Sequence, residues 1–316
     1  MAADLPPETV TSLPYRDDAD FRRIRQLCLD TCPLTPVGWN WDHRHWEGQR
    51  FYGEDPDPNP DWPSWIQLWE EEDGRLVGVA HPENLLGEFY LQLPPDYRHL
   101  EAEMVAWGEA NLSAPAPGGE GGRRVRTYVH DYDIPRRRLL RERGYVETPH
   151  WGVFRRLRLG GRGLPVPAIA PGYPLRETRP DPADDQAVAD ILNAAFGRTT
   201  HTAAEFRGFA SRAPSYRRDL DLAAEAPGGG FAAYTGLYWD PANRRGVFEP
   251  VCTHPDHRRR GLALTLMREG LRRLQALGAT DAYVETGDME AANGLYDAVG
   301  FTEAYVGHLW QRDWPA

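Results

Sequence analysis

A short sequence pattern occurs twice in this chain, and it constrains the fold more than any other feature. Pro95-Asp-Tyr-Arg98 and Pro255-Asp-His-Arg258 lie 160 residues apart, and Gly144-Tyr145 and Gly300-Phe301 lie 156 residues apart. The two spacings agree within a short insertion or deletion, which indicates an internal duplication. The 316 residues are enough for two domains of ordinary size. We therefore expect two copies of one domain.

A stretch rich in glycine and proline, residues 159–171, is typical of a linker between domains. We expect one domain over residues 1–158 and a second over residues 172–316. In both halves, short runs with strand patterns alternate with amphipathic helical patterns, in a similar order. These patterns predict a mixed α/β fold for each domain.

The transition from strand to helix around residues 253–263 has the richest chemistry of the second half. A strand pattern over residues 246–253 leads into three arginines and a glycine, and a helical pattern then continues to Gly278. The first turn of a helix has unpaired N–H groups, and arginine presents forked donors that suit phosphate. The stretch predicts a pyrophosphate site formed by Arg258, Arg259, Arg260, Gly261, Leu262 and Ala263. The alternative is a solvated basic loop that begins an ordinary helix.

Composition limits the class of partner. The net charge of −11 argues against nucleic acid and against an anionic membrane surface, and it favours cationic ligands such as amines. All 36 basic residues are arginine, which excludes lysine chemistry.

We find no apolar run of membrane-spanning length and no signal-peptide pattern, so we expect a cytoplasmic protein. We expect buried thiols for the three cysteines, and no metal site at Asp42-His43-Arg44-His45, where surface polar residues are the simpler interpretation.

A second motif, Asn293-Gly-Leu-Tyr-Asp-Ala-Val-Gly-Phe301, follows the next predicted strand. Together with Arg258-x-x-Gly261-x-Ala263, in this order, it resembles the Gcn5-related N-acetyltransferase (GNAT) superfamily. The resemblance is strong over residues 172–316 and rests on element order alone over residues 12–158. It implies two tandem domains, each with a central twisted, mostly antiparallel sheet flanked by helices. It also implies acetyl-CoA as cosubstrate and no metal.

The resemblance further implies roles for particular residues. Val251, Cys252 and Thr253 would lie along the pantetheine arm of the cofactor, and Asn293 would hydrogen-bond to that arm. Tyr296 would protonate the leaving thiolate, and Glu249 would act as general base toward the amine. A core aromatic for Tyr296 and a structural carboxylate for Glu249 are the alternatives. Thr286 and Asp288 are weaker candidates for contacts with acceptor or cofactor.

The first copy lacks these groups at the corresponding positions. Glu101 stands opposite Gly261, Glu103 opposite Ala263, and Leu140 opposite Tyr296. Because carboxylates would repel a pyrophosphate and fill its space, we expect the N-terminal copy not to bind acetyl-CoA. It would take the place of a dimer partner, so we expect a monomer that mimics a dimer, or a homodimer.

These observations lead to one main functional hypothesis and two alternatives. We expect direct transfer of acetyl from acetyl-CoA to the amine of a small molecule, with no nucleic-acid or membrane partner. A CoA-binding sensor without catalysis and a protein or peptide N-acetyltransferase stay open. The tryptophan-rich stretch over residues 39–69 predicts either an aromatic pocket for a ligand or a core of large side chains.

Overall fold

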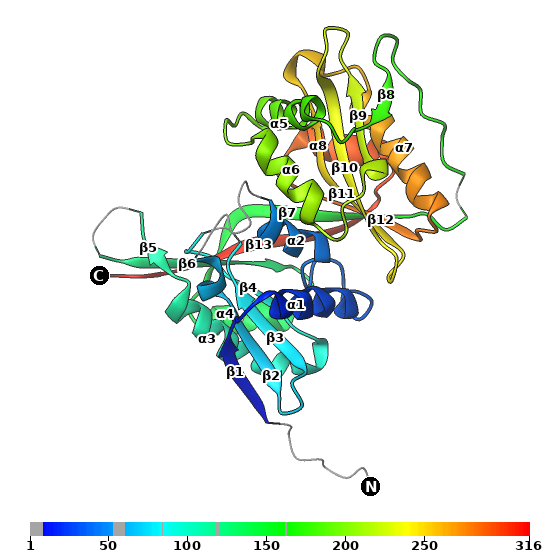
Figure 1. The fold of residues 1–316 in the computed structure, drawn as a ribbon. Helices are drawn as coiled ribbons and strands as arrows, with labels where there is room; N and C mark the ends of the chain where they lie inside the picture. The colour runs from blue at the N-terminus through cyan, green and yellow to red at the C-terminus, as the bar shows by residue number, and fades with distance from the viewer. Residues whose placement is uncertain (1–8, 53–60, 84, 118–120, 162) are drawn as a thin grey trace. The chain divides into compact units, whose positions relative to one another are not determined.

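The computed structural model describes residues 9–52, 61–83, 85–117, 121–161 and 163–316 (Figure 1). The helices are α1 Asp18–Thr31, α2 His43–Phe51, α3 Glu101–Asn111, α4 Ile134–Glu142, α5 Pro182–Phe196, α6 Ala203–Arg212, α7 Leu262–Ala276 and α8 Glu290–Val299. Short 3₁₀ turns are η1 Trp62–Trp65, η2 Pro95–Leu100, η3 Arg218–Leu220 and η4 Pro255–His257. The strands are β1 Val10–Pro14, β2 Gln67–Glu71, β3 Leu76–His81, β4 Tyr90–Gln92, β5 Ala114–Pro115, β6 Arg123–His130, β7 Val146–Arg158, β8 Leu175–Glu177, β9 Asp221–Glu225, β10 Phe231–Asp240, β11 Arg245–Thr253, β12 Asp281–Gly287 and β13 Glu303–Trp314. The predicted α/β class is confirmed.

The chain divides into two compact units that differ from the predicted sequence halves. Unit 1 comprises residues 1–49, 59–151 and 305–316, and unit 2 comprises residues 50–58 and 152–304. Residues 152–158 of β7 pair with β12 inside unit 2, while residues 307–314 of β13 pair with β6 inside unit 1. The boundaries expected at 158 and 172 are therefore corrected: each half ends in a strand that hydrogen-bonds within the other half's unit.

Unit 1 contains the antiparallel sheet β1-β2-β3-β4 and the β6–β13 pair. The helix α3 begins at Glu101, directly after the 3₁₀ turn η2 over residues 95–100. Large aromatic side chains fill the interior of this unit, and Trp46, Trp62 and Trp69 are buried. For these three tryptophans the core interpretation is therefore confirmed.

Unit 2 contains the strand order β7-β12-β11-β10-β9-β8, and only the β11–β12 pair in it is parallel. One face of this sheet packs against α7 and α8 in a cluster that includes Leu266, Leu271 and Phe248. The other face packs against α5 and α6, where Ile191 and Phe206 are buried. A mostly antiparallel sheet with helices on both faces is the predicted arrangement.

Local signals set where the helices of unit 2 begin and end. Asp181 caps α5 by accepting from the backbone N–H groups of Ala183 and Asp184. Thr202 and Glu205 form a reciprocal capping box at the start of α6. Gly197 ends α5 in the left-handed conformation, with φ of 64°, which a residue without Cβ adopts at little cost.

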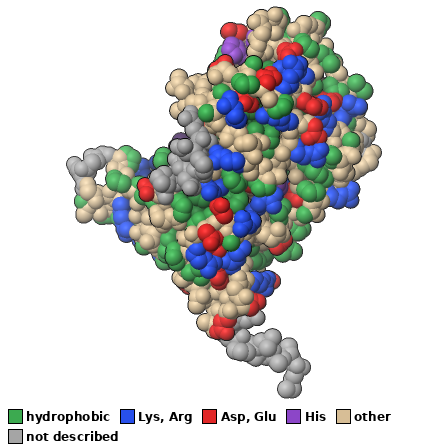
Figure 2. All heavy atoms as spheres, viewed as in Figure 1, with side chains coloured by type: hydrophobic (Ala, Val, Ile, Leu, Met, Phe, Trp, Pro, Cys, Tyr) green, Lys and Arg blue, Asp and Glu red, His purple; other side chains and the backbone are tan. Residues whose placement is uncertain are grey.

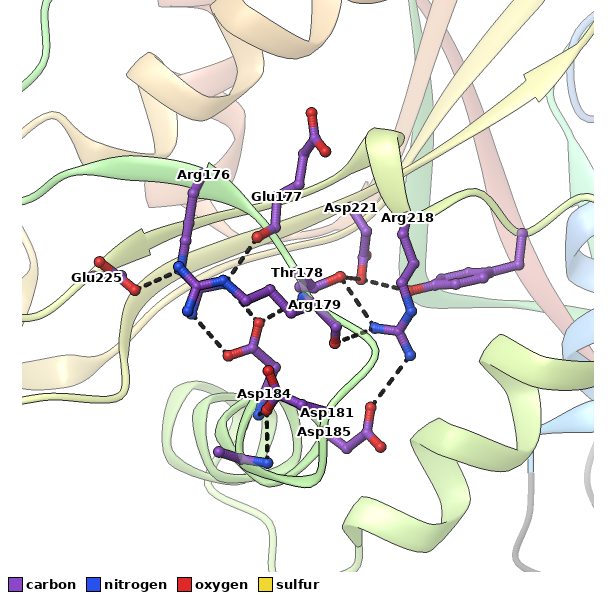
Figure 3. A network of polar contacts seen from close by, with 12 residues as sticks. Arg176, Glu177, Thr178, Arg179, Asp181, Asp184, Asp185, Arg218, Asp221 and Glu225 are labelled. Atoms are coloured by element: carbon purple, nitrogen blue, oxygen red, sulfur yellow. Dashed lines mark hydrogen bonds and ion pairs between the residues drawn. The ribbon is translucent and has the colours of Figure 1, made fainter.

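A buried polar network fixes β8, α5 and β9 relative to one another within unit 2 (Figure 3). Arg176 on β8 pairs with Asp184 of α5 at 2.5 Å. Asp221 at the start of β9 accepts hydrogen bonds from the hydroxyls of Thr178, Tyr216 and Tyr234, at 2.7, 2.8 and 2.5 Å. Burial raises the pKa of the Asp221 carboxyl to about 6, although the three hydrogen bonds lower it in part.

Several expectations about single side chains can be compared with the structure. Cys28 and Cys252 are buried thiols, as predicted, and Cys32 is half-buried. His43 and Arg44 are buried, so the expectation of surface polar residues was wrong for these two. Within the described ranges, no group of three His, Cys, Asp or Glu side chains is arranged to hold a metal ion.

Arginine and acidic side chains are interspersed on the face that Figure 2 shows. Among the described residues many arginines form ion pairs, such as Arg176 with Asp184 and Arg207 with Asp185. The charge of these arginines is therefore compensated by neighbouring carboxylates. In the part of the chain that the structure describes, no helix is long and apolar enough to cross a membrane.

Candidate functional site

The N-terminus of α7 follows β11 through the turn η4. Gly261 is the residue before the helix and has φ of 74°, a left-handed conformation that favours glycine. A Cβ atom built at Gly261 has no neighbour within 4 Å, and no side chain of the described residues caps the helix. The helix therefore begins with open N–H groups and the positive end of its dipole. This is the geometry of an anion site.

The three arginines before Gly261 are all exposed but differ in their contacts. Arg258 donates from Nη2 to the carbonyl of Ala195 at 3.2 Å, and Arg260 lies 5.6 Å from the centre of the Tyr173 ring. Arg259 has φ of 62°, and among the described residues no hydrogen bond or ion pair is recorded for it. The Arg259 guanidinium therefore has donors available for an anion.

Next to this turn, two parallel strands separate. β11 pairs with β12 from Arg245–Asp281 to Phe248–Val284, and the pairing ends there although β11 continues to Thr253. An irregularity in the β10–β11 register places an extra residue of β11 opposite Gly236. A Cβ at Gly236 would lie 2.8 Å from the Glu249 carbonyl oxygen, so glycine is required where the bulge approaches. Pro250, without an N–H, follows Glu249 in the bulge, and the end of β11 is free to diverge.

A cavity of about 970 Å³ opens at this divergence, and every residue that lines it belongs to unit 2. The lining comes from the ends of α5 and β11, from the turn and first residues of α7, and from α8. It comprises Ala195, Phe196, Val251, Cys252, Thr253, His257, Arg258, Arg259, Arg260, Gly261, Leu262, Ala263, Leu264, Met289, Glu290, Ala291, Ala292, Gly294, Leu295 and Tyr296. The structure thus brings the predicted strand residues, the predicted anion loop and Tyr296 to one cavity.

Tyr296 lies on α8 with 5% of its surface exposed, and its ring packs against Phe301. Burial raises the pKa of its hydroxyl to about 12, and the nearby Arg155 guanidinium lowers it in part. The charges of Cys252, Glu249 and Glu285 add to the increase in pKa. The hydroxyl is therefore protonated at neutral pH, and Tyr296 is one of the residues that line the cavity.

Asn293 is not among the residues that line the cavity, and its contact with the cofactor arm stays a prediction. Its amide nitrogen donates to the carbonyls of Gly287 and Met289, at 3.2 and 3.1 Å. Its oxygen accepts from Nε of Arg155 at 3.1 Å. The Asn293 side chain therefore joins the start of α8 to β7 and to the end of β12.

Glu249 lies at the bulge of β11, half-buried, and it is also outside the cavity lining. Its charge is close enough to raise the pKa of Tyr296. Thr286 and Asp288 are likewise outside the lining. The role of Glu249 as a base stays a prediction.

The lining also contains residues that the sequence analysis missed. Phe196 and Met289 are exposed by 42% and 57%, although both are large and apolar. Gly294 is an exposed residue inside α8, and a Cβ built there has no neighbour within 4 Å. A glycine inside an amphipathic helix was the available signal, because glycine in a helix usually has a packing or functional reason.

With this geometry described, comparisons with known proteins assign the fold. Residues 186–301 match the acetyltransferase (GNAT) family, and the curated proteins contain no match to the sequence. A GCN5-related N-acetyltransferase from Sphaerobacter thermophilus superposes with a TM-score of 0.62 at 20% identity, covering 97% of this chain and 96% of that one. A tandem GNAT protein from the clavulanic acid biosynthesis pathway gives a TM-score of 0.63 at 15% identity, covering 98% and 99%. An acetyltransferase of the GNAT family from Colwellia psychrerythraea gives 0.58 at 12% identity, covering 96% and 100%.

The matched residues 186–301 include the α7 turn, the separated strands and Tyr296. The structural likeness extends over nearly the whole chain and so includes unit 1. Residues 186–301 thus match the acetyltransferase (GNAT) family, and over nearly its full length the chain has the fold of a tandem GNAT protein.

Proposed function

We propose that unit 2 binds acetyl-CoA in the cavity of about 970 Å³ and transfers its acetyl group directly to the amine of a small molecule. One observation carries the proposal. The same cavity is lined by an uncapped helix N-terminus with three arginines and by Tyr296, whose hydroxyl is protonated at neutral pH. A pyrophosphate needs the first feature, and a leaving thiolate needs the second.

The residues present fit the cofactor. The left-handed Gly261 leaves open space where a side chain would stand, so a phosphate can reach the backbone N–H groups of Leu262 and Ala263. Arg259 adds a guanidinium with available donors. The residues at the end of β11, Val251 to Thr253, would run along the pantetheine arm. When bound, the cofactor supplies an acetyl group activated as a thioester.

Two protons must move in such a transfer. The attacking amine loses one, and the departing sulfur gains one. Tyr296 carries its proton at neutral pH, because burial holds its pKa at about 12, and it would donate that proton from Oη to the sulfur. Glu249 would accept the amine proton through a water molecule, since it lies on the strand next to the divergence. No covalent intermediate on the chain is needed, and burial raises the pKa of the Cys252 thiol to about 12, which makes it a poor nucleophile.

A small cationic amine is the acceptor class that the net charge of −11 favours, because an acidic protein attracts cations. A protein or peptide amine is the alternative acceptor. A thiol-release assay with acetyl-CoA across polyamines, amino sugars, amino acids and peptides separates the two acceptor classes. Binding of acetyl-CoA without thiol release on any amine would instead support the non-catalytic sensor.

Gly261→Glu tests the cavity directly. It places a carboxylate at the proposed pyrophosphate position, and we expect acetyl-CoA affinity by calorimetry to fall at least a hundredfold. Gly278→Glu is the matched control. Gly278 lies beyond the other end of α7, has φ of 93°, and also has no neighbour within 4 Å of a built Cβ. Equal affinity in the two variants would reject the site.

A further inference from the structure

Unit 1 keeps the strand geometry of the unit 2 site. The residues just before β4 meet the middle of β6 in a single parallel bridge, Glu88 with Arg126, where the backbone N–H of Phe89 donates to the Arg126 carbonyl at 2.9 Å. These positions lie 160 and 158 residues before Phe248 and Val284, the last β11–β12 pair of unit 2. After Phe89, β4 pairs with β3 in the described register, and β6 pairs with β13 and β5. The parallel contact therefore ends at the same point in both copies.

The Val37–Trp41 segment lies against the β4 side of this divergence. The side-chain amide of Asn40 accepts from the backbone N–H of Leu93 at 3.2 Å and donates to its carbonyl at 2.9 Å. The backbone N–H of Trp41 donates to Oε1 of Gln92 at 2.7 Å. Leu93 precedes Thr253 by 160 residues, and Thr253 is a strand residue assigned above to the pantetheine arm. The Asn40 amide thus occupies both backbone hydrogen-bonding groups of the residue that corresponds to Thr253.

The same segment lies against the β6 side. The Tyr132 hydroxyl donates to the Val37 carbonyl at 2.7 Å, just beyond the end of β6. Gly38 has φ of 78°, and a Cβ there would lie 2.3 Å from the ring of His130, the last residue of β6. The segment therefore spans from one diverging strand to the other, at a distance that only glycine permits.

In unit 1 the charged groups at the start of α3, which corresponds to the start of α7 in unit 2, are already paired with one another. Glu101, in the first turn of α3, is 4% exposed and pairs with Arg98 and Arg136, each at 3.1 Å. Both guanidiniums also lie over the Trp39 ring, 4.2 and 5.0 Å from its centre. The negative charge of Glu101 is thus balanced by two arginines. Repulsion between Glu101 and a pyrophosphate therefore does not by itself explain why this copy would not bind one. The arginines there are already paired, and Trp39 covers them.

We infer that the Val37–Trp41 segment is a built-in occupant of the unit 1 divergence, held there by Asn40, so that the chain has one acyl-CoA site. The assignment of unit 2 as that site rests on the proposed function. The occupancy of unit 1 rests only on contacts within unit 1.

Amide hydrogen exchange at Leu93 tests the occupancy without any ligand. We expect Asn40→Ala to accelerate exchange of the Leu93 N–H about tenfold, since it removes the only acceptor that the described residues show for that N–H. Asn111→Ala is the matched control, because Asn111 is exposed and its amide donates only to the Trp107 carbonyl. Equal Leu93 exchange in wild type, Asn40→Ala and Asn111→Ala would overturn the inference.

A second experiment measures the number of acetyl-CoA molecules bound per chain, and the hydrogen exchange of residues 37–41, at saturating acetyl-CoA. We expect one molecule bound per wild-type chain, none per Gly261→Glu chain, and unchanged exchange in residues 37–41. Two molecules bound, or faster exchange in residues 37–41 on addition of acetyl-CoA, would contradict the inference while leaving unit 2 as a site. No binding to wild type would instead reject the proposed function, and the Leu93 exchange would still decide whether the segment fills unit 1.

Discussion

At the scale of single residues, Tyr296 and Asn293 show that only some residues of one motif line the cavity. Both belong to one motif on α8, three residues apart. The Tyr296 side chain forms part of the cavity wall, whereas the Asn293 amide holds α8 to neighbouring strands. The motif therefore has one member that lines the cavity and one whose side chain joins neighbouring elements.

Replacement of Tyr296 by phenylalanine is expected to lower kcat about a hundredfold, because it removes a proton donor and leaves the ring in place. Affinity for acetyl-CoA should stay within about twofold. Tyr283→Phe serves as the control, since Tyr283 is buried on β12 outside the cavity lining. Steady-state kinetics with acetyl-CoA and the best amine acceptor measures both. A kcat equal to wild type would remove Tyr296 from the mechanism.

Asp221 predicts a pH dependence of stability. Its pKa in the folded state is raised to about 6 from an ordinary value of 3.8, so the folded state holds the proton more tightly than the unfolded chain. Its contribution is complete below about pH 4 and is lost as the pH rises through 6. We expect the unfolding free energy of wild type, relative to Asp221→Asn, to fall by up to about 3 kcal/mol from pH 4 to pH 7. Urea unfolding at both pH values measures it, and a constant difference would contradict it.

At the scale of elements, the site results from where β11, α7 and α8 begin and end. β11 leaves its parallel partner after Phe248, α7 begins after Gly261, and α8 presents a glycine to the space between them. The bulge opposite Gly236 and the left-handed turn at Gly261 are backbone features, and each depends on the absence of a Cβ. The shape of the cavity therefore depends first on the conformation of the backbone at these two glycines.

Two substitutions at Gly294 test the stability of α8 and the volume of the cavity independently. Gly294→Ala should stabilise unit 2 by up to about 1 kcal/mol, because alanine favours the helix and the Cβ meets nothing. Gly294→Trp should raise KM for acetyl-CoA at least tenfold by filling the cavity. Ala298→Trp, at an exposed position of α8 outside the lining, is its control. Thermal unfolding and kinetics measure the two effects, and similar KM values for both tryptophan variants would contradict the assignment.

At the scale of the whole molecule, the order of the sequence and the division into compact units differ. Leu157 belongs to the first half of the sequence, yet it is buried in the core of unit 2. Trp310 belongs to the second half and is buried in the core of unit 1. Each unit therefore depends on a strand from the other half of the sequence to complete its core.

Two core substitutions in the full chain test this exchange of strands. Leu157→Ala should destabilise unit 2 by about 2–5 kcal/mol, and Trp310→Ala should destabilise unit 1 by about 3–5 kcal/mol. Hydrogen exchange should show loss of protection in α7 and β12 for the first variant, and in α3 and β6 for the second. The reverse pattern would mean that each half of the sequence forms its own core.

Local sequence patterns determined the elements and the anion turn of unit 2. Hydrophobic periodicity, capping residues such as Asp181, and glycines such as Gly197 and Gly261 act within a few residues of backbone. The elements and the turn could be predicted because the interactions that form them are close in sequence. The expectation that Tyr296 lies near the turn came instead from the family resemblance of the second motif, and the structure brings the two to one cavity.

Only the tertiary structure decided which distant groups meet. The Asn293 amide hydrogen-bonds to Arg155, 138 residues away, and the Asn40 amide hydrogen-bonds to Leu93, 53 residues away. β13 paired with β6, although the sequence places them in different halves. A single side chain or strand edge can satisfy its hydrogen bonds with many partners, and packing of the whole core selects one. The sequence thus determined the kind of site, and the tertiary contacts decided that unit 2 keeps it open while the chain's own segment fills unit 1.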